Sequence, residues 1–161
     1  MVGKALVLGR IRVYLCHSVS IRLHEQEAVN GLAASLQVVV NDLARLLLRR
    51  RRSDSQKDGM KLRTILDKAG IPSINEMAII ESGMMAWTAF QGGVLHKDFS
   101  DLSADSRTRS AADLKLRIPP DSSKAMMNAV RVWNQCDELR TANSRYSAKH
   151  AIKKFVRTIP V

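Results

Sequence analysis

The sequence is poor in aromatic residues and in cysteine. Phe, Trp and Tyr make up only 4% of its 161 residues, so the core must be built from aliphatic side chains, which favours helices packed on helices over a β-sandwich. The two cysteines, Cys16 and Cys136, cannot supply a disulfide framework or a structural zinc site by themselves. The expected location is therefore a reducing, intracellular one, nuclear or cytoplasmic.

Long apolar runs are also missing. A membrane-spanning helix requires roughly 18 uncharged apolar residues, and Lys4, Arg10, Arg12 and Arg22 interrupt the apolar amino end. No membrane-spanning segment is therefore expected, and no membrane partner is assigned.

Catalytic and ligand-binding motifs are absent as well. We find no Gly-rich phosphate loop, no Ser elbow and no Cys/His nucleophile pair. Cys16, His17 and His24 lack the paired spacing of a zinc site, and the aspartates from Asp98 to Asp105 lack the Gly and terminal Glu of a calcium loop. No catalytic residue, cofactor or metal is assigned, and the chain is not expected to be an enzyme on its own.

Positive charge is abundant. Lys and Arg number 26 against 15 Asp and Glu, which gives a formal net charge of +11. Such an excess attracts polyanions, so nucleic acid is the first partner to consider and an anionic membrane surface the second. The charge is clustered: Arg49 to Arg63 contains seven basic residues with only Asp54 and Asp58, and the chain after Glu138 contains six with no acid.

The stretch Leu36 to Arg52 predicts a central helix that starts near Asn30-Gly31 and runs to about Arg50. Its apolar residues recur at the three- and four-residue spacing of one helix face: Leu36, Val39, Val40, Leu43, Leu46 and Leu47. The polar face is predicted to carry Gln37, Asn41, Arg45 and Arg49. Four consecutive arginines end the stretch, where they suit the partly negative carboxyl end of a helix.

The rest of the chain predicts a mainly α fold of about five helices in a single domain, or domain fragment, over residues 1–161. Polar turn residues predict an exposed loop at 53–59, and a second loop is expected near 94–112. The four further helices are predicted from Leu62 to Ala69 with Gly70 as the end, from a Ser73/Glu76 capping box to Gly92, from about Ser122 to Cys136, and from Arg145 to Arg157.

Two stretches alternate as β-strands do. Leu114–Ile118 alternates cleanly before Pro119-Pro120, so it predicts one short strand. A single strand needs a partner, and the alternating region Ile11–Leu23 is the candidate, although part of that region also fits a helix.

The basic clusters supply the candidate site residues. Guanidinium groups bind phosphate with two hydrogen bonds and stay charged at physiological pH, so the arginine run can hold a nucleic-acid backbone. An import signal and a solvated helix end are the alternatives. The predicted phosphate contacts are Arg45, Arg49, Arg50, Arg51 and Arg52, with Arg145, Lys149, Lys153, Lys154 and Arg157 on the last helix.

The sequence offers few features that could recognise nucleic-acid bases. No zinc finger, basic zipper or homeodomain pattern is present, so sequence-specific readout is not expected. The rings that might stack on bases are Tyr14, Tyr146, Trp87 and Trp133, but both tryptophans lie on apolar helix stripes and are predicted to be core residues.

Four segments resemble, in the same order, the tail of reverse transcriptases encoded by non-LTR (LINE-type) retrotransposons. They are SLQVVVNDLARLLLRRRRSD, LDKAGIPSINEMAIIESGMMAWTAF, TRSAADLKLRIPP and AVRVWNQCDELRTANSRYSAKHAIKKFVRTIPV. The positions that carry the resemblance are Leu36, Gln37, Asn41, Ala44, Arg45, Gly70, Pro72, Ser73, Thr108, Arg109, Trp133, Asn134, Cys136, Leu139, Arg140 and Ala142.

This resemblance implies a region at or beyond the thumb, where such enzymes hold template RNA and the priming duplex. The chain lacks the catalytic Asp-Asp palm motif of that family, so polymerase activity is not implied. The first hypothesis is a non-catalytic helical module that binds RNA or an RNA–DNA backbone. The alternatives are a helical interaction fragment that docks on a polymerase core protein, and a degenerate retrotransposon-derived fragment without function.

Overall fold

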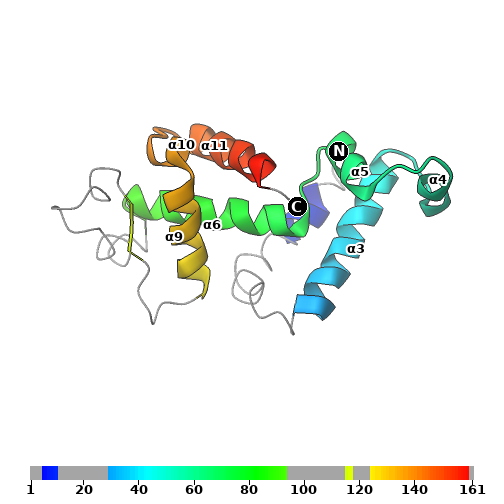
Figure 1. The fold of residues 1–161 in the computed structure, drawn as a ribbon, viewed down its shortest axis with the longest axis horizontal. Coiled ribbons are helices and arrows are strands. Elements are labelled where there is room, and N and C mark those ends of the chain that lie inside the picture. The colour runs from blue at the N-terminus through cyan, green and yellow to red at the C-terminus, as the bar shows by residue number, and fades with distance from the viewer. Residues whose placement is uncertain (1–4, 11–28, 94–114, 118–123, 160–161) are drawn as a thin grey trace. The chain divides into compact units, whose positions relative to one another are not determined.

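The computed structural model describes residues 5–10, 29–93, 115–117 and 124–159 (Figure 1). The described residues are mainly helical, which confirms the predicted mainly α class. The helices are α3 (Val29–Leu47), α4 (Arg52–Lys57), α5 (Leu62–Ala69), α6 (Ile74–Phe90), α9 (Lys124–Gln135), α10 (Asp137–Arg140) and α11 (Arg145–Thr158). Residues 5–10 are also helical.

The chain divides into two compact units, Met1–Met77 and Ala78–Val161, with the boundary inside α6. Among the described residues, no helix is both long enough and apolar enough to cross a bilayer.

The first unit is built on α3 and α5. Its buried apolar residues are Val40, Leu43, Ala44, Ile65, Leu66, Ile71, Ile74 and Met77. α5 follows the predicted bounds because Gly70 adopts the left-handed conformation, with φ of 61°, that ends a helix. The hydrogen bond from the Ile71 N–H to the Leu66 carbonyl, 3.0 Å, closes this end.

The predicted Ser73/Glu76 capping box is present at the start of α6. The Ser73 N–H donates to Oε2 of Glu76 at 2.7 Å, and the Glu76 N–H donates to Oγ of Ser73 at 3.3 Å. Glu76 also accepts from Nη2 of Arg63 at 2.7 Å, which connects this helix start to α5. The local sequence signals at the end of α5 and at the start of α6 were therefore sufficient to predict the turn between these helices.

The buried face of α3 is rotated from the predicted one. Among the side chains of this helix that the structure describes, four large apolar ones are exposed, namely Val38, Val39, Leu46 and Leu47. Gln37 and Asn41, predicted on the polar face, lie inward: Oε1 of Gln37 accepts the Ile74 N–H at 2.9 Å, and its Nε2 donates to Oδ1 of Asn41 at 2.7 Å. The first N–H groups of a helix have no partner within it, so a buried helix start such as that of α6 requires an acceptor from elsewhere.

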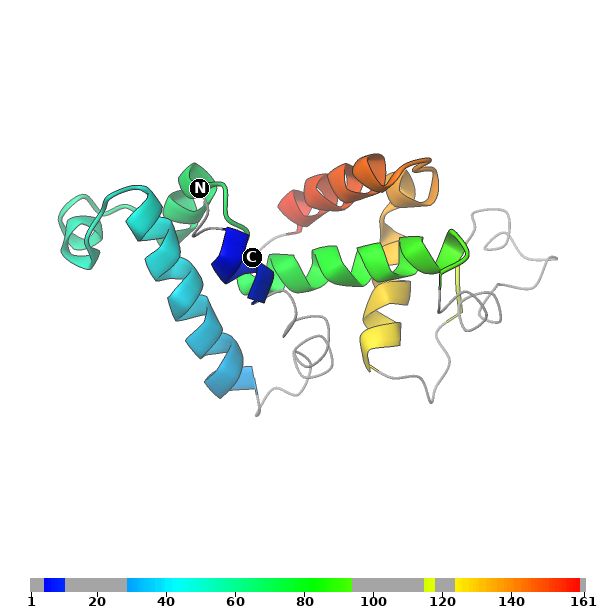
Figure 2. The ribbon, with the colours of Figure 1, turned by 180° about the vertical axis from the view of Figure 1, so that it is seen from behind.

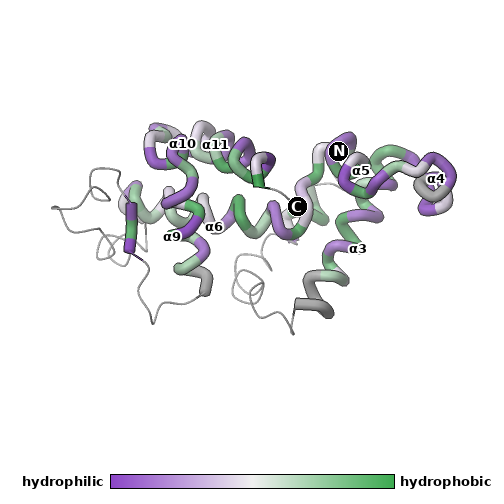
Figure 3. The backbone as a smooth tube through the Cα atoms, in the orientation of Figure 1, coloured by the Kyte–Doolittle hydropathy of each residue, from purple (hydrophilic) through white to green (hydrophobic). Residues whose placement is uncertain are grey.

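Residues 53–57 of the exposed loop predicted at 53–59 form most of α4 instead. This helix is polar throughout (Figure 3). Oδ2 of Asp54 accepts the Arg51 N–H at 2.7 Å, and the Asp58 N–H donates to the Asp54 carbonyl at 3.0 Å. The structure differs from the prediction because Ser and Asp favour the first turn of a helix as well as loops.

The second unit packs α9, α10 and α11 around α6 (Figure 2). Its fully or nearly buried residues include Met84, Ala86, Val130, Trp133, Leu139 and Ile152. Gly83 permits the close approach of these helices, because a Cβ there would lie 2.8 Å from Cδ1 of Ile152 and 2.9 Å from Cγ1 of Val132. A glycine inside a helix normally costs about 1 kcal/mol relative to alanine, and here it makes room for two neighbouring helices.

Of the strand predicted over Leu114–Ile118, the structure describes residues 115–117, and Leu116 forms a β-bridge there. The Leu116 N–H donates to Oδ1 of Asn134 at 2.8 Å, and Nδ2 of Asn134 donates back to the Leu116 carbonyl at 2.8 Å. A carboxamide offers the same donor and acceptor as a peptide group, so the Asn134 side chain on α9 satisfies both backbone groups of Leu116. The expected partner strand Ile11–Leu23 and the loop near 94–112 lie outside the described residues.

Candidate nucleic-acid interface

The arginine run does not continue α3 as a straight helix. α3 ends at Leu47, and Arg49 adopts a positive φ of 52°, which is uncommon for a residue other than glycine. The Arg50 N–H still reaches back to the Arg45 carbonyl at 2.8 Å. The run therefore forms the turn between α3 and α4 rather than one helical face.

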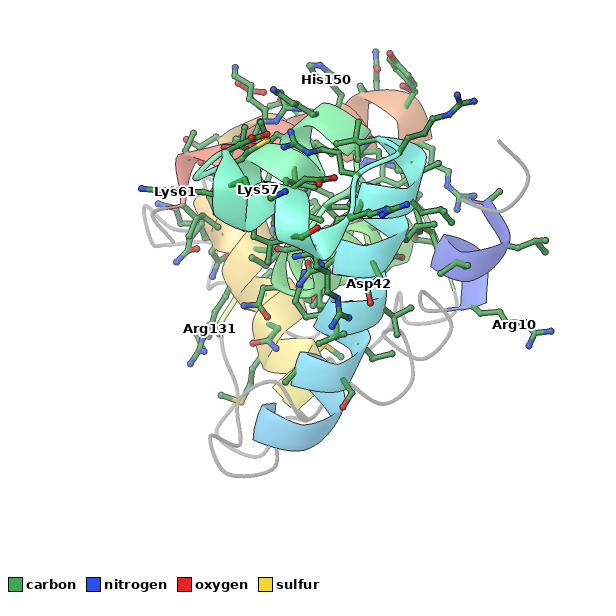
Figure 4. All side chains as sticks on the ribbon, turned by 90° about the vertical axis from the view of Figure 1, so that its right-hand side faces the viewer. Arg10, Asp42, Lys57, Lys61, Arg131 and His150 are labelled. Atoms are coloured by element: carbon green, nitrogen blue, oxygen red, sulfur yellow. The ribbon has the colours of Figure 1, made fainter. Side chains whose placement is uncertain are left out.

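Two arginines of the run are held by carboxylates of the same unit. Arg52 binds Asp42 with both Nε, at 3.1 Å from Oδ1, and Nη2, at 2.6 Å from Oδ2. Asp42 lies on α3 (Figure 4), and the hydrogen bond from Arg52 holds the pKa of its carboxyl below the usual range. Arg50 forms an ion pair with Asp58, and its Nη1 lies 3.3 Å from Sδ of Met60. These two charges are partly neutralised at short range.

Arg45 is also engaged. Its Nη1 donates to Oδ1 of Asp42 at 3.0 Å, and its side chain is only 18% exposed. Of the five cations predicted in this region, Arg45 and Arg50, whose side chain is 20% exposed, are thus the two that are mostly covered by protein.

Arg49 and Arg51 are exposed, and they differ from Arg50 and Arg52 in their ion pairing. Within the described part of the chain, neither side chain has an acidic partner. An exposed guanidinium without a carboxylate can present its fork of donors to a phosphate. The run thus supplies two available cations, separated by one that is paired.

α11 carries the second basic cluster. Ser144 caps the helix by accepting the Ser147 N–H at 3.1 Å, and no acidic residue occurs between Arg145 and Thr158. Arg145, Lys153 and Arg157 are exposed, whereas Lys149 is half-buried. Figure 3 shows hydrophilic and hydrophobic residues alternating along this helix, as expected for one buried and one solvated face.

The acids nearest in sequence to α11 are already paired. Glu138 forms an ion pair with Lys154 and raises the pKa of that ammonium group. Asp137 pairs with Arg140, whose side chain is only 8% exposed. Lys154 is thus committed to Glu138, while the charges of Arg145, Lys153 and Arg157 have no acidic partner in the described residues.

Of the two tryptophans predicted to be core residues, Trp133 is buried and Trp87 is half-buried. Trp133 is 3% exposed and stacks on Phe90 with a centroid distance of 4.2 Å and an interplanar angle of 15°. Trp87 is half-buried, and its Nε1 donates to the Ala142 carbonyl at 3.1 Å. Tyr146 is 82% exposed. Tyr14 lies outside the described residues.

Several positions that carry the family resemblance hold the fold together. Gln37 bonds to the start of α6 and Asn134 bonds to Leu116, as described above. Nη1 of Arg140 donates to the carbonyls of Trp133 and Asn134, at 2.9 and 3.0 Å, across the corner between α9 and α10. Thr108 and Arg109 lie outside the described residues. These described positions have structural roles, so they do not add to the candidate interface.

Other chemistry is sparse in the described residues. They contain no group of three or more His, Cys, Asp or Glu side chains that could hold a metal ion. Cys136 is a free thiol and is 4% exposed; burial raises its pKa, so the unreactive thiol form is favoured. It borders a small surface pocket of about 220 Å³ between α10 and α11.

No protein-family model, curated protein or solved structure matches this chain.

Proposed function

We propose that this chain is a non-catalytic nucleic-acid-binding module that contacts the phosphate backbone of RNA or of an RNA–DNA duplex. The observation that carries the proposal is the division of the basic residues into paired and unpaired sets. Arg145, Lys153 and Arg157 on α11, with Arg49 and Arg51 beside α4, are exposed without acidic partners in the described residues. Such cations release counterions when they bind phosphates.

The resemblance to the tail of LINE-type reverse transcriptases supports RNA or RNA–DNA as the ligand. In that setting the chain would support template binding and would work inside the cell, in the nucleus or cytoplasm. The described residues show no metal-binding group, and the sequence has no catalytic palm motif. The proposed role is therefore binding alone.

A matched pair of double variants tests the assignment in the arginine run. Arg49→Gln/Arg51→Gln removes the two unpaired charges, and Arg50→Gln/Arg52→Gln removes the two that Asp58 and Asp42 hold. We expect the first variant to make the log-log salt slope of RNA binding shallower by about 1.4–1.8 units, from about 0.7–0.9 per phosphate contact. The second should change the slope by less than half as much.

Both variants lower the net charge by two, so a change in total charge alone would affect them equally. Equal slopes for the two variants would contradict the division into paired and unpaired arginines. Slopes unchanged from the starting protein in both would show that the arginine run does not contact the backbone. Circular dichroism of each variant checks that helicity is retained.

The exposed apolar residues of α3 favour a second candidate function, docking on a partner protein such as a polymerase core. Val38 and Val39 are each 48% exposed, and Leu46 is 73% exposed. Because Val39 and Leu46 are seven residues apart, they lie on the same side of the helix. A folded chain that binds neither RNA nor DNA, and whose affinity for such a partner falls on Leu46→Ser, would favour this function over the first.

A further inference from the structure

Tyr146 has a large aromatic ring in an unusual position. Of the aromatic residues that the structure describes, Trp133 and Phe90 stack on each other, Trp87 bonds to Ala142, and Phe155 packs against the core of the second unit. Tyr146 remains 82% exposed. It lies in the first turn of α11, directly after Arg145, so it belongs to the proposed nucleic-acid interface.

The ring shares one stripe of α11 with three groups that bear or can bear positive charge. Tyr146, His150, Lys153 and Arg157 are at positions i, i+4, i+7 and i+11, which at 100° per residue fall within about 60° of arc. All four are exposed, and His150 projects outward from the helix (Figure 4). With a rise of 1.5 Å per residue, the stripe extends for about 16 Å.

Resting on the proposed function, we infer that Tyr146 is a stacking platform for a base, and that this stripe binds single-stranded nucleic acid in preference to duplex. A base can stack on an exposed ring only when its own face is open, as in a single strand or loop. Lys153 and Arg157 then bind phosphates about two and three helical turns farther along. The face of every base is aromatic, so binding through Tyr146 tolerates any sequence.

The sequence alone did not assign Tyr146 to the site, because four rings were candidates. The structure excludes both tryptophans as stacking rings, because Trp133 is buried and Trp87 is hydrogen-bonded to Ala142. The helical signal was nevertheless present, because Tyr146 lies on the same arc as Lys153 and Arg157, and a core residue would lie opposite that arc.

The test compares Tyr146→Ala and Tyr146→Phe in the full chain, with labelled 12-nucleotide oligouridine, oligothymidine and a blunt hairpin duplex as probes. We expect Tyr146→Ala to weaken binding to both single strands by about 5- to 150-fold, the loss of one stacked base. Tyr146→Phe retains the ring and should bind within about threefold of the starting protein. Duplex binding and the salt slope should not change, since no charge is removed.

Three results would overturn the inference while leaving the proposed function intact: an unchanged affinity in Tyr146→Ala, an equal loss for single strand and duplex, or a loss of the same size in Tyr146→Phe. Failure of the starting protein to bind any of the three probes would instead contradict the proposed function itself. Because Tyr146 is exposed, both variants should melt at the temperature of the starting protein, and thermal melting followed by circular dichroism verifies this.

Discussion

Replacing Trp133 with alanine is expected to lower the free energy of unfolding of the second unit by about 3–5 kcal/mol. The indole is 3% exposed and stacks on Phe90, so its removal leaves a cavity between α9 and α6 and forfeits the ring contact. A unit of this size is stable by about 4–12 kcal/mol in total. The variant should therefore lose at least about a quarter of that stability, and urea denaturation followed by circular dichroism measures the loss.

Trp133→Phe is the matched control, because it retains a ring opposite Phe90 and should lose much less stability. Trp87 provides a second comparison for the loss of stability, since its side chain is half-buried and its Nε1 donates a hydrogen bond to the Ala142 carbonyl. A loss of less than 1 kcal/mol in Trp133→Ala would contradict the core role of this residue.

Among the variants that remove charge, neutralising the three exposed, unpaired cations of α11 is expected to produce the largest loss of nucleic-acid binding. The variant is Arg145→Gln/Lys153→Gln/Arg157→Gln. If each residue neutralises one phosphate of a single strand, the log-log salt slope becomes shallower by about 2 units, and affinity at 0.1 M salt falls about 100-fold. Fluorescence anisotropy of a labelled RNA over a series of salt concentrations measures both quantities.

The ion pair between Lys154 and Glu138 supplies the control for that experiment. Lys154→Gln/Glu138→Gln changes two charged residues near the same face but leaves the net charge unaltered. We expect its salt slope to match that of the starting protein. A triple variant whose slope does not differ from the slope of this control would remove α11 from the interface.

Local signals predicted the elements whose hydrogen bonds are local. Gly70 ends α5, and Ser73 and Glu76 cap α6, because each of these interactions joins residues no more than five positions apart. The spacing of the apolar residues in the same way predicted the helix from Arg145 to Arg157, which matches α11 (Arg145–Thr158) closely. Sequence spacing was a sufficient guide to these features.

Interactions between distant residues could not be predicted in this way. Gln37 turns toward α6 because the Ile74 N–H, 37 residues away, needs an acceptor, and this contact is not encoded in the periodicity of α3. Asn134 bonds to Leu116 across 18 residues. Both cases depend on a buried backbone group finding a side-chain partner.

The same limitation applied to the candidate site. All four arginines of the run have the same charge in the sequence, and only the structure distinguishes Arg50 and Arg52, which are held by Asp58 and Asp42, from Arg49 and Arg51. Asp58 and Asp42 are eight and ten residues from the arginines that they bind. Their pairing depends on the turn after α3, which the straight helix predicted to about Arg50 did not include.

The most direct test of the proposed interface is the salt dependence of RNA binding by the intact chain. Five exposed cations, two in the arginine run and three on α11, predict a linear log-log plot against salt concentration, with a slope of about −3.5 for a single strand if all five engage phosphates, and about −2 if only α11 does. A slope near zero, measured on a chain that circular dichroism shows to be helical, would contradict a phosphate-binding interface on this protein.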